Sequence, residues 1–316
     1  MVTSAPLRLA FFGTPEFAVP SLAILLESRH EVVALVSQPD RPKGRGQKLQ
    51  PTPTKQVALD AGIPVLQPAK IREDTFLDAF RDLRVDLGVV AAYGKILPDA
   101  LLAIPPMGMI NVHASLLPAY RGAAPVHRAV IDGLAQTGVT IMRVVRELDA
   151  GPMLARVTRP IATDETSVDV ERGLARLGAG LLLEVIEQLA AGTAKEEPQD
   201  DRAATYAAKI TREEGTLDWA LPAAAIHDRV RGLQPWPLVA AGLDGRRYLL
   251  HRTAHDPQSV AAAPGAIVEA AGDRLVVATA RGTLQILQLQ PEGRRVLSSR
   301  EFLAGYRIRP GMIFEP

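Results

Sequence analysis

The sequence predicts an α/β fold for the first part of the chain and a smaller all-β fold for the last part. In the first part, short apolar runs typical of buried parallel strands alternate with segments whose apolar residues recur at helical spacing. After about residue 217, short apolar runs are separated by Gly and Pro, as in a small barrel or sandwich. The length of 316 residues also favours two domains over one.

The expected strands of the first part are short and almost continuously apolar. They lie at residues 7–12, 31–36, 86–91, 108–112 and 138–145. Helical spacing is found at residues 17–26, 76–83, 125–132 and 167–189. This alternation predicts a parallel or mixed sheet covered by helices, in which ligands bind beyond the carboxyl ends of the strands.

The character of the sequence changes at a polar segment. We expect residues 192–208 to be a linker between a first domain, residues 1–191, and a second domain, residues 209–316. Strands of the second domain are expected at residues 248–251, 266–268, 275–279 and 284–289. Turn sequences such as Pro264-Gly265 and Arg281-Gly282 separate them.

Composition excludes several classes of function. The chain has no cysteine, which removes disulfide scaffolds, thiolate nucleophiles and Cys-ligated zinc. The first residues lack the apolar core of a secretion signal, and no stretch reaches the roughly 18 apolar residues of a membrane span. The six histidines have no metal-ligand spacing, and no Gly-x-Ser-x-Gly motif is present. We therefore expect a cytoplasmic protein without a metal and without a membrane partner.

Gly13 follows the first expected strand, the position of a dinucleotide-binding turn. The run that it opens, Gly13-Thr14-Pro15-Glu16-Phe17, lacks the second and third glycines of that motif. An ordinary helix start explains Pro15 and Glu16 better than a phosphate cradle does.

Charge is balanced over the whole chain but not along it. The totals are 36 Lys and Arg against 35 Asp and Glu, whereas residues 207–316 carry 14 against 11. Within residues 38–55 there is one acid, Asp40, and five cations: Arg41, Lys43, Arg45, Lys48 and Lys55. A Pro- and Gly-rich segment of this kind predicts a surface loop that contacts phosphates, and a merely solvated loop is the alternative.

The strongest candidate for chemistry is the end of the fourth expected strand. If that strand continues, Asn111 and His113 lie two residues apart and project from the same face. An amide beside an imidazole can polarise a carbonyl and move a proton. The alternative is a loop in which Asn111 caps a turn and His113 fills a surface gap.

A third segment, Leu148-Asp149-Ala150-Gly151-Pro152, reads first as a turn. Asp149 gains a role only if the fold brings it to the strand end that carries Asn111 and His113. There, its carboxylate could orient the imidazole.

These segments together resemble the enzymes that use 10-formyltetrahydrofolate. The resemblance rests on Phe12-Gly13-Thr14-Pro15-Glu16-Phe17, Asn111-Val112-His113-Ala114-Ser115-Leu116-Leu117-Pro118 and Leu148-Asp149-Ala150-Gly151. Further segments resemble the members of that group that act on an aminoacyl-tRNA: residues 38–46, 121–125, 137–142, 236–237 and 287–291. Arg146-Glu147 is a bulkier and more charged lead-in to Asp149 than the family pattern has.

The resemblance implies a Rossmann-like formyltransferase domain followed by an oligonucleotide-binding (OB)-like β-barrel. It implies formyl transfer from 10-formyltetrahydrofolate to the α-amine of methionine on initiator tRNA, giving N-formylmethionyl-tRNA for translation initiation. No metal is implied, and we expect a monomer. The implied catalytic residues are Asn111, His113 and Asp149. The implied folate contacts are Ser115, Leu116, Leu117 and Pro118, and the implied tRNA contacts are Arg41, Lys43, Arg45 and Lys48.

Two alternatives stay open at this point. A formyltransferase acting on a sugar-nucleotide amine or on glycinamide ribonucleotide would share the Asn, His and Asp set but lack the basic loop. An RNA-binding module with an inactive catalytic fold would bind tRNA without turnover. The sequence also leaves open whether His113 or Asp149 accepts the proton of the amine.

Overall fold

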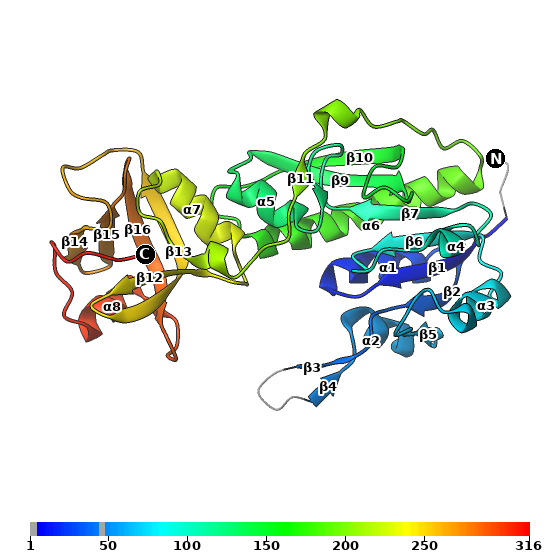
Figure 1. The fold of residues 1–316 in the computed structure, drawn as a ribbon, viewed down its shortest axis with the longest axis horizontal. Helices are drawn as coiled ribbons and strands as arrows, with labels where there is room; N and C mark the ends of the chain where they lie inside the picture. Colours follow the sequence, from blue (N-terminus) through cyan, green and yellow to red (C-terminus); the bar gives the residue numbers. More distant parts are fainter. Residues whose placement is uncertain (1–4, 44–47) are drawn as a thin grey trace. The chain divides into compact units, whose positions relative to one another are not determined.

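The computed structural model describes residues 5–43 and 48–316. A mixed seven-stranded sheet forms the centre of its first part (Figure 1). The order is β10-β9-β7-β6-β1-β2-β5. Its strands are β1 (Arg8–Gly13), β2 (Glu31–Val36), β5 (Val65–Leu66), β6 (Leu87–Ala91), β7 (Met109–His113), β9 (Gln136–Arg143) and β10 (Met153–Pro160). Strands β5, β2, β1, β6 and β7 pair in parallel, and β9 runs antiparallel to β7. The predicted α/β class is confirmed.

Helices flank this sheet and connect its strands. They are η1 (Glu16–Ala18), α1 (Val19–Leu26), α2 (Pro53–Asp60), α3 (Asp74–Asp82), α4 (Asp99–Leu102) and α6 (Ser167–Ala190). In helix α3, the helical spacing of apolar residues places Phe76, Leu77 and Phe80 on one buried face. Phe80 lies 5.5 Å from the ring centroid of Phe12 on β1, so this face covers the sheet.

The basic segment is more structured than the loop that we expected. Its arms form an antiparallel hairpin of β3 (Arg41–Lys43) and β4 (Lys48–Gln50). Helix α2 then begins at Pro53, where the Thr52 side chain accepts a hydrogen bond from the backbone of Lys55. Proline at the first helical position and threonine at the cap explain why a Pro-rich sequence enters a helix here.

The last part of the chain is built on a six-stranded antiparallel sheet. The order β12-β13-β16-β15-β14, with β17 beside β16, joins β12 (Val239–Leu243), β13 (Arg246–Asp256), β14 (Ile267–Ala271), β15 (Arg274–Ala278), β16 (Thr283–Pro291) and β17 (Leu297–Ser298). Helices α7 (Ala223–Gly232) and α8 (Ser299–Gly305) accompany it. The carboxyl-terminal segment hydrogen-bonds Gly242 on β12 and Ile267 on β14, which are the end strands of the order. The β fold predicted for this part is confirmed, and its closure into an OB-like barrel stays a prediction.

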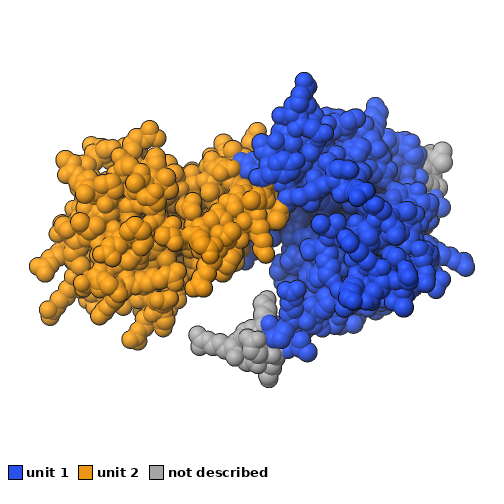
Figure 2. Space-filling view, viewed as in Figure 1, with its two compact units in different colours: residues 1–122, 138–159, 171–206 blue, residues 123–137, 160–170, 207–316 orange. Residues whose placement is uncertain are grey.

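The chain forms two compact units, coloured separately in Figure 2, and each unit is assembled from segments that alternate along the sequence. Unit 1 comprises residues 1–122, 138–159 and 171–206, and unit 2 comprises residues 123–137, 160–170 and 207–316. Helix α5 (Pro125–Ile131) therefore belongs to unit 2, where Arg128 pairs with Glu214. Residues 192–208 contain η2 (Asp201–Ala203) and the whole of β11 (Tyr206–Ala207), which pairs with β8 (Arg121–Gly122). No helix in the described part of the chain is long and apolar enough to cross a membrane.

Candidate active site

The strand that carries Asn111 and His113 continues one residue further than we expected. Because β7 runs through His113, the two side chains share one face of the strand. Asn111 pairs with Val90 of β6 and Met142 of β9, so neighbours on both sides fix its backbone. Within residues 5–43 and 48–316, no group hydrogen-bonds the side-chain amide of Asn111, which is partly exposed. The amide is available to a bound molecule.

The imidazole of His113 is buried and held by one hydrogen bond. Its Nε2 atom lies 3.0 Å from the carbonyl oxygen of Tyr120. A carbonyl oxygen only accepts, so Nε2 carries the hydrogen, and the lone pair of the neutral ring lies on Nδ1. Nδ1 faces Oδ2 of Asp149 at 3.7 Å, which is beyond hydrogen-bond distance. A lone pair and a carboxylate thus face each other, and a proton between them would be attracted to both.

The turn with Asp149 does reach this strand end, as its predicted role requires. Oδ2 of Asp149 accepts a hydrogen bond of 2.8 Å from the backbone N–H of Gly122. The backbone of Asp149 is left-handed, with φ of 50°, an uncommon conformation for a residue with a side chain. At Gly151, an added Cβ would lie 2.0 Å from the carbonyl oxygen of Arg143, so only glycine fits there.

The four residues expected to contact folate follow β7, and they divide into two pairs. Ser115 and Leu117 are each 1% exposed. The Ser115 hydroxyl donates to the carbonyl oxygen of Ala119 at 2.6 Å, and the Leu117 N–H donates to Oγ1 of Thr140 at 3.1 Å. Leu116 and Pro118 keep partly accessible side chains. In this structure, Ser115 and Leu117 shape the segment, and Leu116 and Pro118 present its surface.

Three of the four cations expected to contact tRNA lie on strands β3 and β4. Arg41 is exposed, Lys43 and Lys48 occupy facing positions of the two strands, and Arg45 lies outside the described residues. Lys55, which contributes to the local excess of charge, is instead paired. Its Nζ lies 2.6 Å from Oδ2 of Asp40 and 2.8 Å from Oε1 of Gln67.

Gln67 joins Asp40 and Lys55 in a hydrogen-bonded cluster at the base of the hairpin. The sequence did not indicate this cluster. The Gln67 amide donates to Oδ1 of Asp40 at 2.7 Å and to the carbonyl oxygen of Gln38 at 2.8 Å. Hydrogen bonds from Lys55 and Gln67 lower the pKa of Asp40 below its ordinary value, so the carboxylate stays charged and bound. We call Asp40, Lys55 and Gln67 the hairpin brace.

Comparison with known proteins agrees with this fold and site. Residues 7–186 match the family model described as formyl transferase, and residues 209–307 match the model of its C-terminal domain. The chain belongs to the formyl transferase family.

Within that family, the chain is similar over nearly its whole length to methionyl-tRNA formyltransferases. The chain is 45% identical to that of Geobacter sulfurreducens over 307 residues, which cover 97% of this chain and 96% of the relative. It is 44% identical to that of Heliobacterium modesticaldum, covering 98% of this chain and 100% of the relative. The resemblance inferred from the motifs is confirmed.

Solved structures of lower identity share the fold. The sugar 3N-formyl transferase WlaRD superimposes with a TM-score of 0.68 at 16% identity, covering 92% of this chain and 99% of that one. HypX from Aquifex aeolicus in complex with tetrahydrofolic acid gives 0.64 at 18% identity, covering 94% of this chain and 47% of that one. This chain therefore spans about half the length of HypX.

Proposed function

We propose that this chain transfers the formyl group of 10-formyltetrahydrofolate to the α-amine of methionine on initiator tRNA, in the cytoplasm. The observation that carries the proposal is the meeting of Asn111, His113 and Asp149 at one strand end. Relatives named methionyl-tRNA formyltransferase, aligned over almost the full chain, support the choice of acceptor. The basic hairpin supports it too, because an amine acceptor without a phosphate backbone would have no use for it.

The first step is attack of the neutral amine on the formyl carbon. A new N–C bond forms, and the formyl oxygen becomes the oxyanion of a tetrahedral intermediate. The free amide of Asn111 is placed to donate a hydrogen bond to that oxygen. Such a donor, held rigidly by flanking strands, typically contributes ~10²–10³ in rate.

The second step moves a proton from the attacking nitrogen to the leaving one. The lone pair on Nδ1 of His113 supports the imidazole, rather than Asp149, as the acceptor of the amine proton. The resulting imidazolium faces the carboxylate of Asp149, which stabilises its charge. The proton then passes to N10 of the folate as the bond from the formyl carbon to N10 breaks. Asp149 acts here through charge and orientation, and it is not itself protonated.

The donor would be held by the segment that follows β7. Leu116 and Pro118 offer apolar surface to the folate, next to the Asn111 amide that faces the formyl group. Of the four residues predicted to contact folate, we assign this role to Leu116 and Pro118 because their side chains are partly accessible.

The test is direct formylation by the purified protein. Charged initiator tRNA and 10-formyltetrahydrofolate should give formylmethionine, and elongator methionyl-tRNA serves as the control acceptor. Formylation of a sugar-nucleotide amine or of glycinamide ribonucleotide in place of the tRNA would assign the chain to another member of its family. Binding of tRNA with no formyl transfer would instead support a binding module and contradict the proposal.

A further inference from the structure

The turn with Asp149 is held from the segment that the sequence predicts to be a linker. The side-chain amide of Gln199 donates to the carbonyl oxygens of Asp149, at 2.8 Å, and Gly151, at 2.7 Å. These are the two residues that flank Ala150 in the turn. Both amide hydrogens of Gln199 are thus used on the backbone of one turn.

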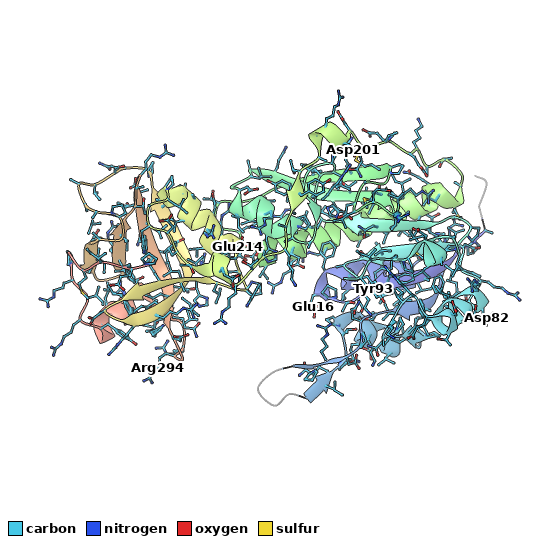
Figure 3. The ribbon with its side chains drawn as sticks, viewed as in Figure 1. Glu16, Asp82, Tyr93, Asp201, Glu214 and Arg294 are labelled. Atoms are coloured by element: carbon cyan, nitrogen blue, oxygen red, sulfur yellow. The ribbon has the colours of Figure 1, made fainter. Side chains whose placement is uncertain are left out.

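Arg121 determines which way that amide faces. Its Nε and one terminal nitrogen donate to Oε1 of Gln199 at 3.0 and 2.8 Å. A guanidinium has only donors, so the oxygen of Gln199 must face Arg121 and the NH₂ must face the turn. Arg121 is 4% exposed, and its charge is balanced by Asp201 at 2.8 Å; Asp201 is labelled in Figure 3.

The residue next to Arg121 also contacts the carboxylate of Asp149. Gly122, the neighbour of Arg121, donates its N–H to Oδ2 of Asp149. Asp149 is therefore held at its carbonyl by Gln199 and at its side chain by Gly122. A left-handed aspartate persists only where its surroundings determine it, and these contacts do so.

We propose that Gln199 is a positioning residue for formyl transfer, with Arg121 as the residue that orients it. Gln199 holds the 149–151 turn so that the carboxylate of Asp149 faces Nδ1 of His113. The inference rests on the proposed function, because it assigns Asp149 the task of stabilising a protonated His113. A 1 Å displacement of a catalytic group can cost about 100-fold in rate.

The decisive variant is Gln199→Glu. It keeps an oxygen for Arg121, with a stronger charge interaction, so the local fold is retained. It removes both donors to the turn and sets a carboxylate oxygen against two carbonyl oxygens, so the turn must move. Arg202→Ala is the matched control, because Arg202 lies in the same segment, is exposed and pairs only with Asp200 among the described residues.

The experiment measures single-turnover formylation, the KM of each substrate and the midpoint of thermal unfolding. For Gln199→Glu we expect a fall of about 10- to 100-fold in the single-turnover rate, with both KM values and the unfolding midpoint near those of the unmodified protein. Arg202→Ala should match the unmodified protein in every measurement.

Three results would overturn the inference. A Gln199→Glu rate within about twofold of the unmodified protein would show that the turn needs no such support. A rise in either KM without a fall in rate would assign Gln199 to binding. A rate loss that only follows a lower unfolding midpoint would make its role purely structural. If the unmodified protein itself formed no formylmethionine, the proposed function would fail, and this inference with it.

Discussion

Two loops of unit 1 are both held by hydrogen bonds that involve side chains, but at different places. The 149–151 turn is fixed at the reacting group itself, through contacts of Gln199 and Gly122 with Asp149. Among the described residues of the β3–β4 hairpin, the side-chain contacts lie at its base, in the hairpin brace, and Arg41 is exposed.

The difference follows from what each loop must recognise. Proton transfer depends on atoms placed within a fraction of an ångström, so the support contacts the catalytic residue directly. Attraction to phosphates acts over about 8 Å at physiological salt, so a charged arm needs a direction but no exact position. Damage to the turn should therefore lower the rate, and damage to the hairpin should weaken tRNA binding.

The largest effect is expected from Asn111→Ala. Loss of the amide donor should lower kcat by ~10²–10³, because the oxyanion of the intermediate is then unsupported. The KM of methionyl-tRNA should stay within about threefold, since Arg41 and the hairpin are unchanged. Steady-state kinetics with each substrate varied in turn measures both. Near-normal kcat would remove Asn111 from the chemistry.

A backbone change in the turn should have the next largest effect. In Gly151→Ala the new methyl group meets the carbonyl oxygen of Arg143, so the turn must shift and kcat should fall about 10- to 100-fold. Gly180→Ala is the control, because a Cβ at that position of α6 has no atom within 4 Å, and it should leave kcat unchanged. Equal rates for the two variants would show that the turn tolerates displacement.

A change in the hairpin should alter the KM of methionyl-tRNA rather than kcat. Arg41→Ala should raise the KM of methionyl-tRNA about tenfold, equivalent to ~1.4 kcal/mol, and leave the KM of the folate unchanged. The slope of log affinity for tRNA against log salt should become shallower by about 1. Equal increases in both KM values would indicate a folding defect.

A smaller effect of the same kind is expected when the brace is weakened. Gln67→Leu removes one of the side chains that hydrogen-bond Asp40 and should raise the KM of methionyl-tRNA about threefold, with kcat preserved. A fall in kcat with unchanged KM would contradict the separation of the two loops. Gln56→Leu is the control, because Gln56 is exposed and bonds only Asp60 among the described residues.

The smallest effect concerns pH. The pKa of Asp40 is lower in the folded protein than its ordinary value. The stabilisation that the Asp40 carboxylate gives the hairpin brace is therefore complete at any pH above the ordinary pKa, and it is lost only as pH falls through the lowered pKa. The ratio of KM values for methionyl-tRNA between Asp40→Asn and the unmodified protein should therefore be constant from about pH 6 to pH 8. A ratio that changes across this range would show that the brace titrates there.

Much of the fold and of the site could be predicted, because the signals are local. Apolar runs marked the parallel strands, and a spacing of two placed Asn111 and His113 on one face. The supports could not be predicted, since Gln199 lies 50 residues from Asp149, and a side chain that binds a distant carbonyl leaves no periodic signal. The sequence also counts Lys55 with the free cations, because its pairing with Asp40 and Gln67 becomes visible only in the folded chain.

The most direct test of the central claim uses the fact that Asn111 is the only asparagine in the sequence. Protein labelled with ¹⁵N-asparagine has a single pair of side-chain amide signals, which report on the group assigned to the formyl oxygen. A stable 10-formyl folate analogue should shift that pair, in the unmodified protein and equally in Arg41→Ala. An unshifted pair at an analogue concentration that saturates binding would contradict the assignment of the β7 end as the site of formyl transfer.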